Sequence, residues 1–269
     1  MSSAARLMPN VSQRKKKGCT AYRESGTGEV VLLIHGVGMN ADAWEPQIEE
    51  LSRTHRVIAL DMHGHGASDP PGTSVELNDY VLQAIRLLDE LAIEQANIVG
   101  HSMGGLVAIG MGLGHPQHVL RLAALNAVYE RPPEARSAVE ARAKEILRSG
   151  NCRDIDLPIR RWLGDSETQL QHKVRSWLLS VEPDSYANAY RVFASGNRLF
   201  SGLLGLLPMP CLFATGSDDP NSTPQMSEMM AAATRRGRAV ILPGQRHLMN
   251  LVDSVGTNRL LCNFLAEPC

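Results

Sequence analysis

Gly100-His101-Ser102-Met103-Gly104 is the stretch of sequence that decides the fold. A short apolar run at residues 97–99 precedes it and predicts a buried strand, and a helical pattern at 104–112 follows it. A serine at a sharp corner between strand and helix has a strained backbone, and side chains two residues to either side would collide. Glycine at positions 100 and 104 removes that collision. The stretch therefore predicts a strand, a tight turn that exposes the Ser102 hydroxyl, and a helix.

Outward from this unit, short apolar runs alternate with helical patterns along the chain. The runs predict strands covered on both faces, at residues 30–34, 57–60, 97–99, 120–125, 211–215 and 239–242. Apolar residues recur every three or four positions most clearly at 75–91, and helices are also expected at 225–235 and 250–265. The alternation predicts the fold class α/β, with a mostly parallel, doubly wound sheet and helices on both faces.

The alternation stops between Pro132 and Pro208. Helical patterns occur there at 134–147, 168–179 and 185–194, with no strand-like run between them. We therefore expect a single domain over residues 1–269. Its core is predicted to be formed by 20–131 and 209–269, and residues 132–208 to form a helical cap over one edge of the sheet.

The Ser102 hydroxyl is a weak nucleophile, so it needs a base, and the base needs a carboxylate that orients it. Such partners follow the later strands of a parallel sheet at their carboxyl ends. His247 is the only histidine beyond the last predicted strand, and Asp218 and Asp219 follow the strand at 211–215. Only one of two adjacent carboxylates can face the histidine, and the residues alone leave the choice open.

His35-Gly36-Val37-Gly38 follows the first predicted strand. Its two glycines allow a tight turn beneath a substrate. The backbone N–H groups of Val37 and Met103 are then expected to form an oxyanion hole, the pair of donors that binds a developing negative charge.

Together, HGVG (35–38), DMHGHGASD (61–69), GHSMGG (100–105), GSDDPNSTP (216–224) and the late His247 resemble the α/β-hydrolase superfamily over essentially the whole chain. The resemblance implies that Asp219 is the triad acid, since it fills the aspartate position of the G-x-x-D-P loop. Two short stretches, at 185–190 and 247–251, are similar to bacterial oxoadipate enol-lactone hydrolases and related esterases. His63 and the pair Gln245-Arg246 depart from the family's commoner residues.

The amino-acid composition indicates which kinds of binding partner to expect. The net charge is −1, with 27 basic against 28 acidic side chains, so no field attracts nucleic acid or an anionic membrane, and the expected partner is a small molecule. The basic residues at 14–17 are expected to be solvated charge on a loose terminus. Five cysteines without CxxC spacing indicate neither disulfides nor a zinc site and favour the cytoplasm. No cofactor or metal is expected.

The sequence therefore predicts a serine hydrolase that cleaves a small carboxylic ester or lactone through an acyl-enzyme on Ser102. Cleavage of an amide or of a C–C bond by the same triad is the first alternative. A ligand-binding protein that retains the fold without catalysis is the second.

Specificity is expected to lie in the cap. Trp162, Trp177 and Tyr190 are predicted to wall the pocket, with ordinary packing of cap helices as the alternative for the two tryptophans. Four arginines of the cap, Arg160, Arg161, Arg175 and Arg191, are each expected on a solvated face. Any one that points inward would bind a substrate carboxylate.

Overall fold

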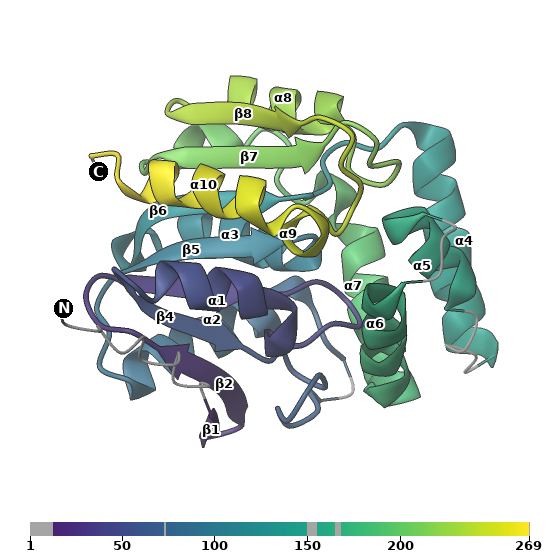
Figure 1. Cartoon of the computed structure of the whole chain (residues 1–269). Coiled ribbons are helices and arrows are strands. Elements are labelled where there is room, and N and C mark those ends of the chain that lie inside the picture. The colour runs from purple at the N-terminus through teal and green to yellow at the C-terminus, as the bar shows by residue number, and fades with distance from the viewer. Residues whose placement is uncertain (1–12, 73, 150–154, 165–167, 269) are drawn as a thin grey trace, which may run out of the picture.

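A sheet crosses the middle of the molecule, and helices cover both of its faces (Figure 1). The computed structural model describes residues 13–72, 74–149, 155–164 and 168–268. Within them the strand order is β1-β2-β4-β3-β5-β6-β7-β8. The parallel strands are β3 (Val30–Ile34), β4 (Arg56–Leu60), β5 (Ala96–His101), β6 (Val119–Leu125), β7 (Cys211–Gly216) and β8 (Gly237–Leu242). The predicted α/β class with a mostly parallel sheet is confirmed.

Two antiparallel strands at one edge, β1 (Arg14–Lys17) and β2 (Thr20–Ser25), complete the described sheet. The expectation that 14–17 is a loose terminus is therefore wrong. Ion pairs hold β1 in place: Arg14 Nε lies 3.1 Å from an Asp61 oxygen, and Lys16 Nζ lies 2.6 Å from Asp69. All four side chains of β1 are charged and exposed, and the strand pairs with β2 along its length, so an apolar pattern cannot reveal it.

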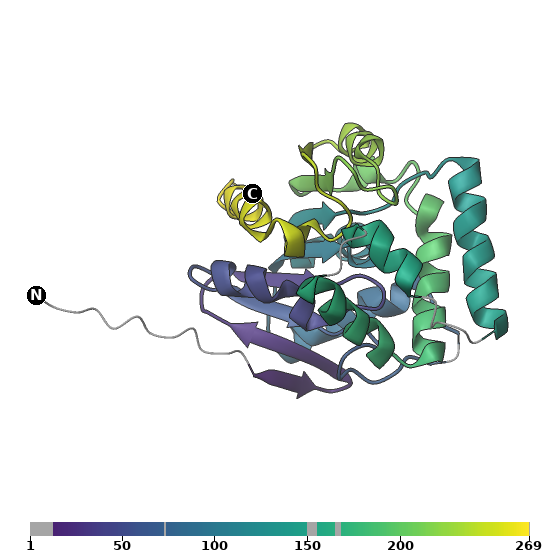
Figure 2. The same cartoon turned by 45° about the vertical axis from the view of Figure 1, so that its right-hand side comes forward.

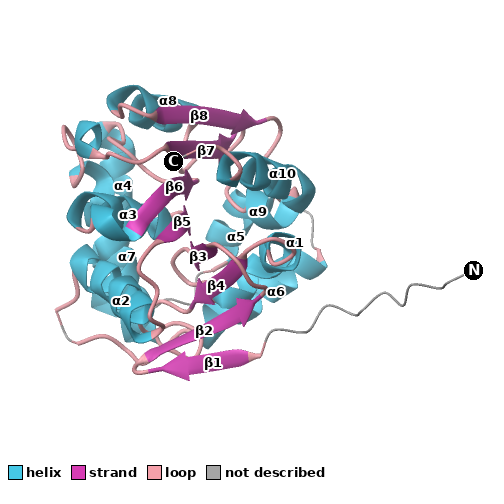
Figure 3. Ribbon diagram, turned by 90° about the vertical axis from the view of Figure 1, so that its left-hand side faces the viewer, coloured by secondary structure: helices cyan, strands magenta, loops and turns pink. Residues whose placement is uncertain are grey.

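Helices form one layer on each face of the sheet, as the view along the sheet shows (Figure 3). One layer holds α1 (Glu45–Leu51), α9 (Met249–Val252) and α10 (Ser254–Leu265). The other holds α2 (Leu77–Glu90), α3 (Met103–Gly114) and α8 (Pro224–Ala233). The helix predicted at 250–265 is broken at Asp253, whose side chain accepts a hydrogen bond from the Gly256 N–H and so caps α10.

Between β6 and β7 the chain leaves the sheet and forms α4 (Pro133–Ser149), α5 (Asp156–Leu163), α6 (Gln169–Ser180) and α7 (Pro183–Ser195). These helices stand at the carboxyl ends of the parallel strands (Figures 1 and 2). Residues 196–208, which the sequence assigns to the cap, pack on the core instead. Leu204 and Leu207 are fully buried there, and Leu207 lies against Gly112 of α3.

Across the described ranges, no helix has both the length and the apolar character needed to cross a membrane. Cys19, Cys211 and Cys262 are free thiols. Cys152 and Cys269 lie outside the described residues.

Candidate active site

Ser102 occupies the corner between β5 and α3 with φ 55° and ψ −117°, a conformation that residues with a side chain rarely adopt. A Cβ on Gly100 would lie 1.9 Å from the Gly104 carbonyl oxygen, and one on Gly104 would lie 2.1 Å from that of Ile34. Both glycines are therefore required by close packing of backbone, as the sequence predicts. The corner directs Ser102 toward the carboxyl edge of the sheet.

His247, Asp219 and Ser102 lie together at that edge. His247 Nε2 is 3.1 Å from Ser102 Oγ, and His247 Nδ1 is 2.7 Å from Asp219 Oδ2. All three side chains are buried. Asp218 points elsewhere: it is exposed and accepts a hydrogen bond from the Ser217 hydroxyl. The geometry thus distinguishes the two adjacent carboxylates, which the residues alone leave open.

Asp219 is surrounded by donors. Asn126 Nδ2 donates to its Oδ2 at 2.8 Å, and the N–H groups of Asn221 and Ser222 donate to its Oδ1 at 2.8 and 3.2 Å. Burial raises the pKa of Asp219, but His247 and these donors more than offset that and hold the pKa below its usual value. The carboxylate is therefore ionised at neutral pH and holds the imidazole with its proton on Nδ1. His247 Nε2 is left to accept the Ser102 proton.

The HGVG loop passes directly over the serine. A Cβ on Gly36 would lie 3.0 Å from Ser102 Cβ, so the loop needs a glycine at this close approach. Val37 lines the same cavity as Ser102. Met103 is the first residue of α3, where a backbone N–H has no partner within the helix.

Two histidines that the sequence leaves without a role support this loop. His65 Nε2 accepts the Gly38 N–H at 3.1 Å, and His35 Nε2 accepts the Met62 N–H at 2.9 Å. Burial lowers the pKa of His35 to about 4 and that of His65 to about 3. Both rings are therefore neutral and able to accept. Their positions inside the HGVG and DMHGHG motifs are the signal that could have identified them.

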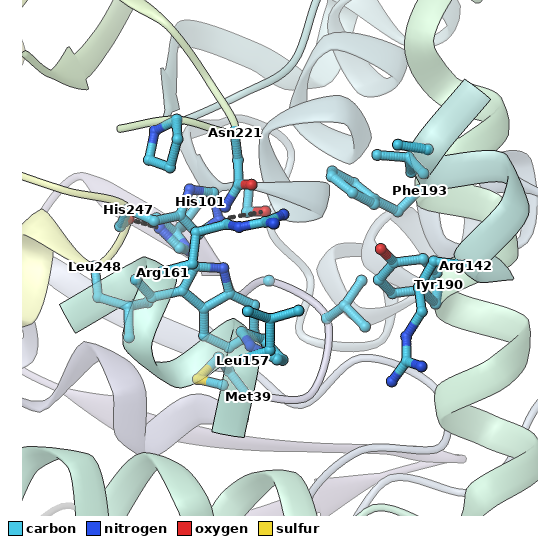
Figure 4. Close-up of a pocket in the computed structure, with 18 of the residues that line it drawn as sticks. Met39, His101, Arg142, Leu157, Arg161, Tyr190, Phe193, Asn221, His247 and Leu248 are labelled. Carbon is cyan, nitrogen blue, oxygen red and sulfur yellow. Dashed lines mark hydrogen bonds between the residues drawn. The ribbon is translucent and has the colours of Figure 1, made fainter. Parts of the chain in front are cut away.

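A cavity of about 540 Å³ lies over Ser102 and His247, between the core and the cap (Figure 4). Trp162 of α5 and Tyr190 of α7 are among its lining residues. The Trp162 ring stacks on the His247 imidazole, with centroids 5.8 Å apart and planes at 30°. Trp177 is not among the lining residues. It is buried in α6, and the Lys173 ammonium lies 5.4 Å from its ring centroid. Trp177 therefore packs within the cap and does not wall the cavity.

The described residues that line the cavity are mostly apolar, and the charged ones among them are all arginines. They include Arg131, Arg142 and Arg161 but no aspartate or glutamate. Burial lowers the pKa of Arg131 to about 10, so it is still protonated at neutral pH, and its guanidinium packs 4.5 Å from the Phe193 ring centroid. No sequence motif marks Arg131 or Arg142, because each lies in a stretch of mixed charge.

Of the four cap arginines predicted to be solvated, one lines the cavity and three do not. Arg161 lines the cavity, whereas Arg175 pairs with Asp156 at 2.5 Å and Arg191 donates to the Val75 carbonyl. Arg160 is exposed and is not among the lining residues.

The fold and the geometry of the site are those of an α/β-hydrolase. The chain belongs to the α/β-hydrolase fold family, whose model matches residues 29–254. It is similar to the (E)-2-((N-methylformamido)methylene)succinate hydrolase of Acinetobacter baylyi, with 41% identity over 242 residues, 89% of this chain and 91% of that one. It is also similar to the 2-(acetamidomethylene)succinate hydrolase of Mesorhizobium japonicum, with 37% identity over 274 residues and 90% of each chain.

The enol-lactonase from Burkholderia xenovorans has the same fold, with a TM-score of 0.83 at 23% identity over 95% of this chain and all of that one. The family and the named hydrolases among its relatives show that the chain is a hydrolase, and the names of those relatives describe small substrates.

Proposed function

We propose that this hydrolase forms an acyl-enzyme on Ser102 and cleaves an amide bond in a small substrate that carries carboxylates. Ser102 Oγ attacks the carbonyl carbon while its proton passes to His247 Nε2. Asp219 stabilises the resulting imidazolium, and the N–H groups of Val37 and Met103 bind the oxyanion. His247 then protonates the leaving nitrogen. A water molecule that gives its proton to the same histidine attacks the acyl group and frees Ser102.

The observation that carries the proposal is the charge of the cavity. A guanidinium matches a carboxylate with two parallel hydrogen bonds, and three arginines face a cavity with no acidic lining residue among those described. Burial raises the pKa of the Tyr190 hydroxyl, and the charges of Arg142, Arg131 and Arg161 offset part of that rise. All three guanidinium groups are therefore close enough to the Tyr190 hydroxyl to act on it electrostatically. In Figure 4, Arg161 is on the His247 side of the cavity and Arg142 is on the Tyr190 side.

The relatives support an amide rather than the ester or lactone that the sequence analysis places first. Both names describe a succinate, hence two carboxylates, that bears an N-acylated aminomethylene group. Formyl and acetyl are small acyl groups, and a cavity of about 540 Å³ lies within the usual range for a small-molecule site. We therefore propose an (acylaminomethylene)succinate as the substrate class.

Ester or lactone hydrolysis is the second candidate, because the contact between Ser102 and His247 serves a leaving oxygen as well as a leaving nitrogen. The buried contacts among Ser102, His247 and Asp219 argue against a ligand-binding protein without catalysis.

A substrate panel tests the proposal. It contains 2-(acetamidomethylene)succinate, its N-methylformamido counterpart, their neutral dimethyl esters, a lactone that carries one carboxylate, and p-nitrophenyl acetate. We expect the highest kcat/KM for a dicarboxylate amide. The neutral diesters should be slower by about 10- to 100-fold for each lost contact between a guanidinium and a carboxylate, since hydrogen bonds to charged groups contribute roughly 1.5–3 kcal/mol. Equal or faster turnover of the amide bond in the neutral diester would overturn the substrate class.

Two adjacent arginines provide a matched pair. Arg161→Gln should raise KM for the dicarboxylate and leave p-nitrophenyl acetate turnover unchanged, whereas Arg160→Gln should change neither, because Arg160 does not line the cavity. Ser102→Ala should lose roughly 10³-fold or more of the activity. A fluorophosphonate should label Ser102 of the native protein, and labelling of another serine would refute the acyl-enzyme.

A further inference from the structure

We infer that His101 is a positioning residue that fixes the backbone of the general base, an inference that rests on the proposed function. His101 Nε2–H donates a hydrogen bond of 2.7 Å to the backbone carbonyl of His247, 146 residues further along the chain. Its side chain is buried, and its ring packs at right angles to that of Trp44. Because His101 directly precedes Ser102, the bond ties the nucleophile's own turn to the residue that carries the base.

The loop between β8 and α9 that carries His247 needs such support. Three consecutive backbone carbonyls of this loop accept hydrogen bonds from three different parts of the core. The Asp218 N–H donates to Gln245 at 2.9 Å, Asn126 Nδ2 donates to Arg246 at 3.4 Å, and His101 donates to His247 itself. The bond from His101 is the shortest of these three. It acts at the residue whose imidazole must meet Ser102 Oγ.

This link sets the separation of the reacting atoms. From Ser102 the path to His247 runs through one peptide bond, one buried imidazole and one hydrogen bond. A displacement of about 1 Å in a reacting group can cost about 100-fold in rate. Loss of the donor should therefore slow proton transfer, without changing the arginine-lined part of the cavity that would bind the substrate.

The charge of His101 also suits the task. Burial lowers its pKa to about 3, so the ring is neutral and has one N–H, which the carbonyl of His247 places on Nε2. The ring centroids of His101 and His247 are 5.1 Å apart. A second positive charge at that distance would oppose transfer of the Ser102 proton to His247, whereas a neutral donor holds the backbone without that repulsion.

Replacing His101 with three residues tests the inference. Gln carries an N–H donor at the end of a side chain of similar reach, and Met has a similar size without a donor. Asn carries the same amide on a side chain one carbon shorter, so its donor stops short of the His247 carbonyl. The Gln and Asn variants retain a decisive comparison if the Met variant does not fold.

The readouts are kcat and KM, the rate of Ser102 labelling by a fluorophosphonate, and the downfield proton resonance of His247 Nδ1–H. We expect His101→Met and His101→Asn to lose about 10- to 100-fold in kcat and in labelling rate with little change in KM, and their downfield resonance to broaden. His101→Gln should recover most of the rate and the resonance.

Wild-type rates in the folded Met or Asn variant, or an equal loss in Gln, would overturn the inference while leaving the proposed function intact. Failure of the wild-type protein to react at Ser102 would overturn the proposed function and, with it, this inference.

Discussion

At the scale of single residues, the contrast between Asp219 and Asp218 is the sharpest test of the site. Asp219 is buried and contacts His247 Nδ1, whereas Asp218 is exposed and accepts a hydrogen bond from the Ser217 hydroxyl. Asp219→Asn should lower kcat by about 10⁴-fold, because an amide stabilises the wrong tautomer of the base. Asp218→Asn serves as the control and should remain near the wild-type value. Steady-state kinetics on both variants would contradict the assignment if the substitution at 218 proved the more damaging.

The sequence is sufficient to predict some residues of the candidate site but not others. Ser102 is predictable because its two flanking glycines are dictated by backbone collisions, and His247 because of its place beyond the last strand. Asp219 is chosen over its neighbour only by resemblance, since the direction of a side chain in a loop depends on tertiary contacts. Arg131 and Arg142 belong to no pattern, because only the folded cap brings them to the cavity.

At the scale of elements, the helices of the cap separate two tryptophans that look alike in the sequence. Trp162 stacks on His247 and lines the cavity, whereas Trp177 is buried away from it. Trp162→Leu should shift the preference among acyl groups by about 1–3 kcal/mol for substrates that contact the ring. Trp177→Leu should change stability but not preference. Ratios of kcat/KM across a series of acyl groups measure both, and a shift in the Trp177 variant would contradict this placement.

The ion pairs of the edge strand β1 are expected to differ in how much they contribute to stability. Arg14 is partly exposed, but its partner Asp61 is fully buried and would lose its guanidinium in Arg14→Met. We expect a destabilisation of about 1–3 kcal/mol, because a buried carboxylate would be left with fewer partners. Lys16→Met removes an exposed ion pair and should cost about 0–1 kcal/mol. Urea unfolding midpoints compare the two, and equal losses would show that Asp61 does not depend on Arg14.

Apolar pattern is the reason that the six parallel strands were predictable and β1 was not. A buried parallel strand is a continuous apolar run, as β3 is from Val30 to Ile34. The side chains of β1 are all charged, and their partners, such as Asp61 and Asp69, are remote in sequence. Helix α5 is not predictable from its pattern for a related reason, since eight residues give too few turns to establish a period.

At the scale of the whole molecule, buried histidines should make stability depend on pH. Burial lowers the pKa of His35 to about 4 and of His65 and His101 to about 3. In the unfolded chain each would titrate near about 6.5. Between those values the unfolded chain binds more protons, so stability falls as pH falls from about 6.5, by up to about 1.4 kcal/mol per pH unit for each histidine.

Urea midpoints between pH 7 and pH 4 measure this slope. His101→Gln should reduce the slope by about 1.4 kcal/mol per pH unit, the contribution of one proton. An unchanged slope in the His101 variant would contradict the prediction.

The connection between β6 and β7 has a consequence for how relatives of this chain can diversify. These strands are neighbours in the sheet and pair directly, Leu122 with Cys211, so the long helical excursion leaves and re-enters the core at adjacent points. Such an excursion can be exchanged, lengthened or replaced while the strand pairing is inherited intact. Recombination at its two ends would then generate new substrate ranges in one step. A segment inserted in its place must supply its own side chain to stack on His247, because in this chain Trp162 of the excursion makes that contact.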